Sequence, residues 1–190
     1  MKPVLYIIAG PNGAGKTTAS FNILPSVLSC NEYVNADEIA RGLSPFDVDS
    51  VAVQAGKLML GRIDHLLSRK VDFAIETTLA TRSHSTLVKK AKTLGYEVVV
   101  IFFWLNSPET ACRRVAGRVS EGGHAIPPDV IVRRYWSGIR NFFSDFIPIV
   151  DYWALYNNVF EPRLIADSDK IVDSALFNYI KECQSRKEEI

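Results

Sequence analysis

The sequence lacks the features that mark several specialised classes of protein. It has three cysteines, Cys30, Cys112 and Cys183, which are far apart, odd in number and without CxxC or Cys/His spacing, so we expect reduced thiols and no cysteine-bound metal. No apolar run approaches the roughly 18 residues of a membrane span, and the first residues lack the length and cleavage site of a signal peptide. We therefore expect no membrane association and a cytoplasmic location.

A strong net charge is also missing. The 22 lysines and arginines are balanced by 21 aspartates and glutamates, which leaves a formal net charge of +1. This balance gives no overall basic field for a nucleic acid or a membrane surface. Hydrophobic residues make up 47% of the 190 residues and charged residues 23%, as in ordinary globular proteins. We expect a single domain over residues 1–190.

Apolar runs and turn residues alternate as they do in α/β proteins. Strands are predicted at Val4–Ala9, Tyr33–Asn35, Phe73–Thr77, Val98–Leu105, Trp153–Tyr156 and Arg163–Ala166. Helices are predicted at Lys16–Leu24, where Pro25 would end the first of them, and at Ala36–Leu43, Asp47–Ser68, Ser85–Leu94, Pro108–Val119, Asp129–Phe143 and Val172–Lys187. The alternation favours right-handed βαβ units, and therefore a three-layer α/β/α fold with a mainly parallel sheet.

The apolar residues of the predicted helices should face the core. In the helix over residues 47–68 the spacing places Leu58 and Met59 inward, and in the helix over residues 85–94 it places Leu94 inward. Aromatic residues near the end of the helix over residues 129–143 are more typical of a core than of a base-stacking platform: Trp136, Phe142, Phe143 and Phe146.

The segment from Gly10 to Thr17 matches the phosphate-binding pattern GxxxxGK followed by Ser or Thr, and it lies between an apolar strand and the start of a helix. Its glycines allow backbone N–H groups to surround phosphate oxygens, and the positive end of the helix points at the same oxygens. Lys16 should reach the β- and γ-phosphates, and the Thr17 hydroxyl should bind Mg²⁺. The predicted nucleotide site comprises Gly10, Pro11, Asn12, Gly13, Ala14, Gly15, Lys16, Thr17 and Thr18.

Two acids follow predicted strands, at the edge of a parallel sheet where ligands bind. Asp37 comes after the strand at Tyr33, and Glu76 closes the strand at Phe73, with Thr78 two residues further on. A carboxylate near the γ-phosphate can deprotonate an attacking hydroxyl or hold Mg²⁺ through water. The alternatives are a helix N-cap for Asp37 and a buried charge paired with a structural arginine for Glu76.

The segment from Asn106 to Arg140 contains no lysine and has six arginines against three acids, a local net charge of +3. Guanidinium groups bind phosphate oxygens bidentately, so residues of about 106–145 are predicted to form a helical, arginine-bearing lid. A glycine-containing loop that includes His124 separates its two helices and is typical of a hinge. A solvated basic helix pair is the alternative. The arginines are Arg113, Arg114, Arg118, Arg133, Arg134 and Arg140.

Together these residues resemble the zeta toxin family, P-loop kinases whose best-known members phosphorylate the sugar 3′-hydroxyl of UDP-N-acetylglucosamine. The resemblance implies a P-loop kinase fold, ATP and Mg²⁺ as cofactors and a small-molecule hydroxyl acceptor, and it admits a separate antitoxin protein as a partner. It runs from about Val4 to Ala166 and rests on the P-loop through Thr18, Asn35-Ala36-Asp37, Glu76-Thr77-Thr78-Leu79, the arginines around Gly122-Gly123-His124, and Tyr156-Asn157-Asn158.

The resemblance also implies roles for individual residues. Asp37 would be the general base, Glu76 and Thr78 would belong to the substrate or Mg²⁺ site, and Lys16 and Arg118 would stabilise the transferring phosphate. Of the adjacent Arg133 and Arg134, one must face the site; Arg134 is assigned to the catalytic set and Arg133 to the substrate set, although the sequence does not choose between them.

The segment after Glu76 departs from the Glu-Gly-Thr-Leu-Arg of the family's nucleotide-sugar kinases. Thr77 replaces the glycine and Ala80 replaces the arginine, with Arg82 two positions later as a further candidate for substrate binding. Kinase chemistry is therefore better supported than this particular acceptor.

Two other functions remain open. A P-loop ATPase or regulatory nucleotide-binding protein could use the same loop, but the strand at Val98–Leu105 lacks the Asp-Glu pair of transporter motors, and neither Ser-Gly-Gly-Gln nor the Asn-Lys-x-Asp of GTPases is present. A nucleic-acid end kinase could use the same arginines, but the near-zero net charge lowers this alternative.

Overall fold

One six-stranded sheet forms the centre of the computed structural model, which describes residues 2–120 and 122–184. Its strand order is β2-β3-β1-β4-β5-β6; the first five strands run parallel and β6 runs antiparallel to β5. This is the mainly parallel sheet that the sequence predicts. The strands are β1 (Val4–Ala9), β2 (Tyr33–Val34), β3 (Phe73–Thr77), β4 (Glu97–Trp104), β5 (Tyr152–Asn157) and β6 (Arg163–Asp167).

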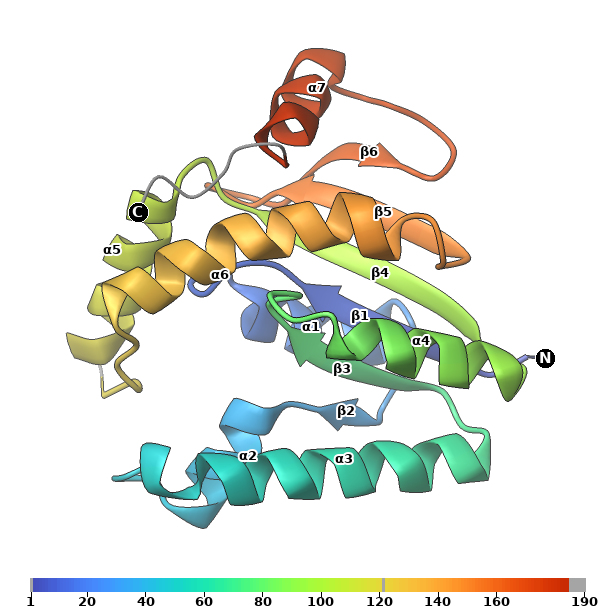
Figure 1. Cartoon of the computed structure of the whole chain (residues 1–190), viewed down its shortest axis with the longest axis vertical. Helices are drawn as coiled ribbons and strands as arrows, with labels where there is room; N and C mark the ends of the chain where they lie inside the picture. Colours follow the sequence, from blue (N-terminus) through green and yellow to red (C-terminus); the bar gives the residue numbers. More distant parts are fainter. Residues whose placement is uncertain (1, 121, 185–190) are drawn as a thin grey trace.

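Helices cover both faces of this sheet. The α-helices are α1 (Lys16–Ser26), α2 (Ala36–Leu43), α3 (Ala52–Arg69), α4 (Ser83–Thr93), α5 (Pro108–Ser120), α6 (Pro128–Asn141) and α7 (Ser174–Cys183), with a 3-10 turn η1 (Asp49–Val51) and a π-helical turn η2 (Phe142–Phe146). In Figure 1, α4 and α6 cross in front of the sheet, α1 lies behind it, and α2 and α3 lie beside β2. Of the helices in the described residues, none is long and apolar enough to cross a membrane.

The central strand β1 lies between β3 and β4, with Ile7 opposite Ile75 on one side and Val100 on the other. All three side chains are completely buried. A strand whose two faces are both covered by helices needs a continuous apolar run rather than an alternating one, and the residues of β1 provide it. The C-terminal end of β1 is thereby fixed, and with it the start of the P-loop.

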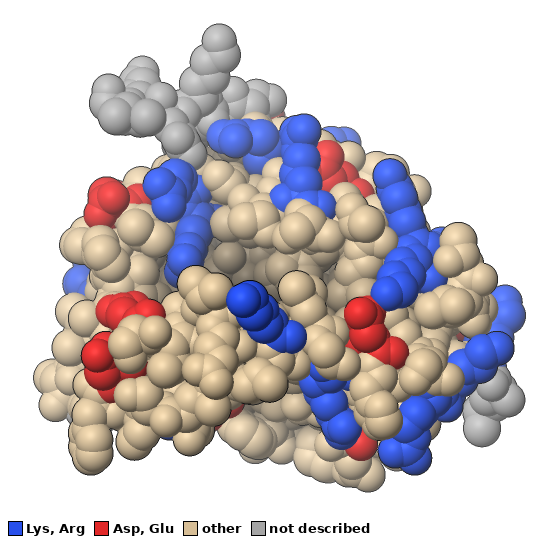
Figure 2. Space-filling model, turned by 60° about the horizontal axis from the view of Figure 1, so that its bottom comes forward, with Lys and Arg blue, Asp and Glu red and all other residues tan. Residues whose placement is uncertain are grey.

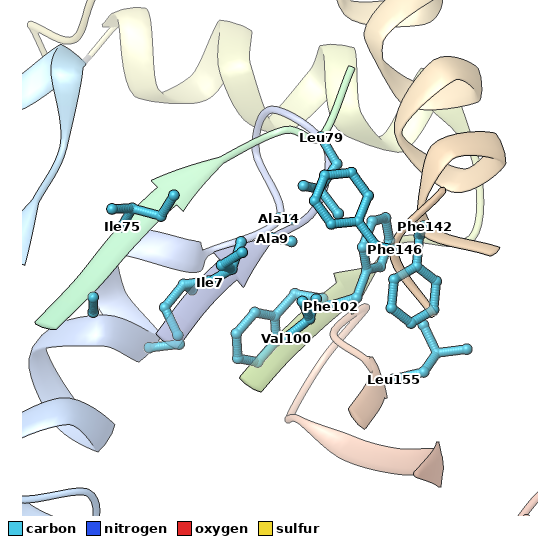
Figure 3. Close-up of a cluster of buried hydrophobic side chains, with 14 of the residues drawn as sticks. Ile7, Ala9, Ala14, Ile75, Leu79, Val100, Phe102, Phe142, Phe146 and Leu155 are labelled. Atoms are coloured by element: carbon cyan, nitrogen blue, oxygen red, sulfur yellow. The ribbon is translucent and has the colours of Figure 1, made fainter. Parts of the chain in front are cut away.

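Aromatic side chains fill the space between the sheet and the end of α6. Figure 3 shows Phe142 and Phe146 of η2 among side chains of β1, β3, β4 and β5. The Phe102 and Phe142 rings lie 4.7 Å apart between centroids, a separation typical of favourable aromatic pairs. The prediction that this aromatic group belongs to the core is confirmed for Phe142, Phe143 and Phe146, which are buried; Trp136 is partly buried and packs against the core.

Several local predictions were wrong. Helix α1 continues through Pro25 to Ser26. The proline lacks the N–H that would bond to the Phe21 carbonyl, but only one helical residue follows it, so this loss affects the last turn alone. Leu58 and Leu94 are exposed, at 48% and 37%, whereas Ile63 of α3 is buried. Met59 is buried as predicted, so the prediction for the inward face of α3 fails at Leu58 alone. The predicted helix end at Lys187 lies outside the described residues.

Candidate active site

The carboxyl ends of β1, β2 and β3 meet at one edge of the sheet and place the P-loop next to both predicted acids. A cavity of about 250 Å³, here named the P-loop cavity, opens at this edge. Its walls include the predicted site residues Asn12, Gly13, Gly15, Lys16, Thr17, Thr18, Asp37, Glu76 and Arg118. Residues as far apart in sequence as Asn12 and Arg118 thus share one cavity.

The loop backbone depends on glycine at two positions in particular. Gly10 has φ of +139°, and a Cβ there would lie 2.3 Å from the Phe103 carbonyl oxygen, so only glycine lets the chain pass β4. Gly15 has φ of +75° and immediately precedes α1. Between them, Ala14 N–H donates to the Pro11 carbonyl at 3.2 Å. The loop is a built structure rather than a flexible turn.

Two side chains from distant segments hold the loop from outside. The Arg114 guanidinium donates to the carbonyls of Gly13 at 3.3 Å, Asn158 at 3.0 Å and Val159 at 2.5 Å. The buried Asn158 amide donates to the Ala14 carbonyl at 2.6 Å. Both residues lie in segments that the sequence singles out, but neither was assigned to the site. Only their position in the fold reveals this clamp, because each acts on backbone carbonyls that have no sequence signature.

Lys16, Thr17 and Glu76 form a compact buried cluster. The Lys16 ammonium lies 3.7 Å from Glu76 Oε1, with 7% and 10% of the two side chains exposed, and it donates to the Pro11 carbonyl at 3.0 Å. Thr17 Oγ1 donates to Glu76 Oε2 at 2.9 Å. Burial lowers the pKa of Lys16, while the nearby carboxylates of Glu76 and Asp37 oppose that shift. Glu76 therefore pairs with the P-loop lysine, not with a structural arginine.

Asp37 lies in the first turn of α2, but it is not the N-cap. The cap is Asn35, whose Oδ1 accepts a hydrogen bond from the Asp37 N–H at 2.8 Å. The alternative interpretation of Asp37 as a cap was therefore wrong, and its carboxylate is free of that role. Asp37 lines the P-loop cavity and also a second cavity of about 130 Å³ beside α2, here named the α2 cavity. It stands where the two cavities meet.

A third cavity of about 320 Å³, here named the corner cavity, lies between the α2–α3 connection and the Gly122–Ala125 loop. Arg41 of α2 lines all three cavities. Its ion pair with Glu38 is a loose one, at 3.6 Å with half of the Arg41 side chain exposed. The fully exposed Phe46 stands at the corner cavity. Arg41 was not among the predicted site residues, because it has no motif around it.

Arg118 at the end of α5 and residues 122–125 of the loop that follows, here named the tip, line these cavities. Arg118 lines the P-loop and α2 cavities and donates to the His124 carbonyl at 3.3 Å. The His124 imidazole Nε2 in turn lies 3.3 Å from Asp49 Oδ1. His124 of the glycine-containing loop thus contacts both Arg118 of α5 and Asp49 of η1, and it lines the α2 and corner cavities.

Most of α6, by contrast, is built into the core. Its Tyr135 hydroxyl donates to the Leu105 carbonyl at 2.6 Å, and Asn141 donates to the carbonyl of Leu79 at 2.7 Å. Within the described residues Arg133 is exposed and Arg134 half-buried, and both lie outside the walls of the three cavities. Within the described residues, the part of the predicted lid that lines the cavities is Arg114, Arg118 and residues 122–125.

Thr78 and Arg82 also lie outside the described walls of the three cavities. Thr78 Oγ1 accepts a hydrogen bond from the Ala80 N–H at 3.4 Å, and its carbonyl packs against Gly138 of α6. Arg82 is 75% exposed and its Nε lies 3.1 Å from Asp145 Oδ2 of η2. Of the four residues predicted to bind substrate, the structure brings only Glu76 to the cavity.

The fold and this site define a P-loop α/β protein of the kinase type, with a glycine-rich loop between β1 and α1 and acids at neighbouring strand ends. The chain belongs to the zeta toxin family, whose model matches residues 1–142. An uncharacterized protein of Haemophilus influenzae is 30% identical over 135 residues, which make up 70% of this chain and 92% of that protein.

Two solved structures share the fold. One, from the PezAT chromosomal toxin-antitoxin system of Streptococcus pneumoniae, has a TM-score of 0.72 and 20% identity over 99% of this chain and 81% of that one. The other, AvrRxo1-ORF1:-ORF2 with ATP, has a TM-score of 0.75 and 17% identity over 97% of this chain and 65% of that one. At these identities the likeness extends to the fold alone.

Proposed function

We propose that this protein is an ATP-dependent kinase that transfers the γ-phosphoryl group to a hydroxyl of a small molecule. The observation that carries the proposal is the convergence of Lys16, Glu76 and Asp37 on the P-loop cavity. A lysine on the phosphates and a carboxylate beside the acceptor are the parts that phosphoryl transfer needs, because its catalysis is mainly positioning and charge stabilisation.

The residues of the P-loop cavity fit ATP and Mg²⁺. Lys16 and the backbone N–H groups of the loop would hold the phosphates, and the Thr17 hydroxyl next to the Glu76 carboxylate supplies the hard oxygen donors that Mg²⁺ prefers. The described residues include no group of three or more His, Cys, Asp or Glu placed to hold a metal, and Mg²⁺ needs none, since it binds through one or two protein oxygens and substrate phosphates. When bound, the ion neutralises phosphate charge.

The chain's own groups then account for the transfer. Asp37, at the junction of two cavities, accepts the proton of the acceptor hydroxyl as its oxygen forms a bond to the γ-phosphorus and the bond to the ADP oxygen breaks. Lys16 from the loop and Arg118 from the tip stabilise the charge on the transferring group. The tip, tied to Asp49 through His124, excludes water from the reaction.

The α2 and corner cavities are the proposed acceptor site. The α2 cavity borders both Thr17 of the P-loop and Asp37, and Arg41 lines it together with the corner cavity. UDP-N-acetylglucosamine, phosphorylated on its 3′-hydroxyl by the best-known proteins of the family that this chain resembles, is the first acceptor to test. Residues 1–190 would act as one domain, with about 106–145 as its closing segment.

The charge on the surface favours a small acceptor over a nucleic-acid end. On the face in Figure 2, lysine and arginine side chains are interspersed with acidic and uncharged residues and form no continuous basic surface. Binding of a polynucleotide depends on a groove of positive charge that follows the phosphate backbone. A nucleotide sugar requires only a local cation such as Arg41.

The decisive experiment incubates the wild type and the Asp37→Asn variant with ATP, Mg²⁺ and UDP-N-acetylglucosamine, other nucleotide sugars, nucleosides or a metabolite extract. We expect a product heavier by one phosphoryl group from the wild type, and a rate at least about 100-fold lower in the variant, because a general base contributes that much. ATP binding should stay within about twofold, since Asp37→Asn preserves the loop.

Asp64→Asn is the matched control, because Asp64 pairs with Lys90 on the exposed side of α3; its rate should equal that of the wild type. Unchanged transfer by Asp37→Asn would contradict the assigned base. ATP consumption without any phosphorylated product would replace the kinase by an ATPase.

We also propose a separate antitoxin protein as a partner. The chain belongs to the zeta toxin family, and the Streptococcus pneumoniae protein with the same fold is part of a toxin-antitoxin system. Expression of the wild type should then arrest growth, whereas expression of Asp37→Asn should not. Normal growth with both would contradict a toxin role and leave the kinase activity as a separate question.

A further inference from the structure

The two acids of the site are connected by a chain of side-chain hydrogen bonds through the end of β2. Tyr33 Oη donates to Glu76 Oε2, and Asn35 Nδ2 donates to Tyr33 Oη at 3.0 Å. Asn35 Oδ1 accepts from the Asp37 N–H at 2.8 Å. Starting at the carboxylate of β3, this chain ends at the backbone of the first turn of α2, where Asp37 lies. We name Tyr33 and Asn35 the β2 relay.

The direction of each hydrogen bond in the β2 relay is determined. Burial, and then the charge of Glu76, raise the pKa of Tyr33. The phenol therefore stays protonated, and its O–H donates a hydrogen bond to the Glu76 carboxylate. Its oxygen is then available as an acceptor for the Asn35 amide. Because an amide N–H of Asp37 faces the other end of Asn35, only the carbonyl oxygen fits there. Rotating the amide by 180° would place its N–H donors against the Asp37 N–H and its carbonyl oxygen against the Tyr33 oxygen, whose proton points to Glu76.

The β2 relay is held by contacts with β3 and α1. Asn35 is 6% exposed, and β2 pairs with β3 through Tyr33 opposite Ala74. The Tyr33 ring packs edge-on against Phe21 of α1, with ring centroids 5.8 Å apart. Asn35 is buried and Tyr33 is half-buried, and a chain of hydrogen bonds with one polarity specifies one geometry more strictly than its individual bond energies suggest.

We propose that Tyr33 and Asn35 are positioning residues, which hold the Glu76 carboxylate and the first turn of α2 in one fixed relation during phosphoryl transfer. This inference rests on the proposed kinase function. Glu76 sets the place of Lys16 and Thr17 on the phosphate side, and α2 sets the place of Asp37 on the acceptor side. The β2 relay therefore aligns the proposed base with the phosphate that its acceptor attacks.

The expected size of the effect follows from what a small misalignment costs. A displacement of about 1 Å in a reacting group lowers a rate by roughly 100-fold, and loss of an outer hydrogen-bond partner of a site residue typically lowers activity by about 10- to 100-fold. The relay contacts neither Lys16, which would bind the phosphates, nor the acceptor. Its loss should therefore lower kcat much more than it raises the KM for ATP.

The test uses two variants that each break one bond and keep the rest. Tyr33→Phe keeps the ring against Phe21 and removes only the hydroxyl. Asn35→Ser keeps a neutral N-cap acceptor for α2, since serine caps as well as asparagine, but its side chain is too short to reach Tyr33. Single-turnover transfer from ATP to UDP-N-acetylglucosamine, or to the acceptor found in the metabolite screen, is measured for each variant and for the double variant.

We expect each single variant to transfer about 10-fold more slowly than the wild type, with ATP affinity within about twofold. The double variant should be no slower than the slower single variant, because both substitutions break one relay. In nitrogen-15 spectra of the whole chain, the Asn35 side-chain amide and the Asp37 backbone amide should both shift in Tyr33→Phe. That readout requires no turnover.

Tyr96→Phe is the matched control. The Tyr96 hydroxyl donates to the Leu66 carbonyl at 3.1 Å and the Val71 carbonyl at 3.0 Å, far from the cavities. It should lose stability without losing transfer rate, which separates positioning from a general structural role.

The possible failures are distinct. Transfer at the wild-type rate in Tyr33→Phe would contradict the relay but not the kinase activity. The same conclusion would follow if the fold-loss of transfer rate in the double variant equalled the product of the two single fold-losses. Unshifted Asn35 and Asp37 resonances in Tyr33→Phe would overturn the relay as well. Absence of transfer by the wild type to any acceptor would overturn the proposed function and the relay together.

Discussion

The phosphate side of the candidate site and its acceptor side are built in different ways. On the phosphate side, the loop from Gly10 to Thr17 is held by Arg114 and Asn158, and Lys16 is buried with Glu76. On the acceptor side, Arg41 is half exposed and the corner around Phe46 is open to solvent. One half is a preformed, hydrogen-bonded structure, and the other is lined by exposed side chains of α2 and of the segment between α2 and α3.

This difference matches what each half has to recognise. The phosphate chain and its metal ion have the same geometry in every nucleoside triphosphate, so a rigid, preorganised binding site suits them. An acceptor varies between enzymes, and surface connections between helices tolerate the substitutions that change specificity. Substitutions in each half test whether the phosphate side is rigid and the acceptor side is open.

The largest expected effect is the loss of the P-loop ammonium group. Lys16→Met keeps the length and apolar stem of the side chain, but it removes the charge that would lie on the phosphates. We expect single-turnover transfer to fall by roughly 1,000-fold, the upper range for one preorganised donor in a dry site. Lys89→Met, on the exposed face of α4, is the control. More than a tenth of the wild-type rate in Lys16→Met would contradict the assigned role.

A smaller effect compares one glycine from each half. Gly10→Ala would place a Cβ 2.3 Å from the Phe103 carbonyl at a φ of +139°, and we expect it to destabilise the protein by about 3 kcal/mol through strain and overpacking. A Cβ at Gly42 of α2 would meet no neighbouring atom within 4 Å, so Gly42→Ala should add roughly 0.5 to 1 kcal/mol of helix stability. Urea unfolding measures both. Equal changes would remove the contrast in rigidity.

The smallest effect concerns the open half. Arg41→Ala should raise the KM for the acceptor by about 10-fold, the cost of one polar contact in the bound state, and leave kcat within about twofold. Steady-state kinetics with the acceptor varied and ATP saturating show the split. Arg69→Ala, on an exposed position at the end of α3, should change neither constant. A fall in kcat with unchanged KM would move Arg41 to the phosphate side.

The local sequence pattern was sufficient to predict the bounds of the strands and the helix that carry the P-loop and the two acids. The predicted bounds of β1, β3 and α2 coincide with the observed ones, because continuous apolar runs and capping residues act within a few residues of chain. Even there a neighbouring residue changed the details: Asn35, not Asp37, caps α2. The pattern of α3 misplaced Leu58, because the apolar residues of that helix fit more than one face and packing on α2 and β2 selects among them.

The sequence does not distinguish the roles of the individual arginines. Arg114 and Arg118 are one turn apart on α5, and both line the P-loop cavity. Arg114 also clamps backbone carbonyls of Gly13 and Asn158, whereas Arg118 also lines the α2 cavity and binds the His124 carbonyl. Arg82 instead extends toward Asp145. A guanidinium group has the same local signature in each of these roles.

The sequence by itself therefore determined the α/β class, the phosphate loop and the two strand-end acids, because these follow from short-range periodicity and from glycine positions that no other residue can occupy. Only the tertiary structure decided which arginines line the cavities, that Asn158 and Tyr33 bind the P-loop and Glu76, and that the proposed acceptor side is open. Those facts depend on contacts between residues more than 40 positions apart, and such contacts are set by how the helices and the sheet pack, which no local pattern records.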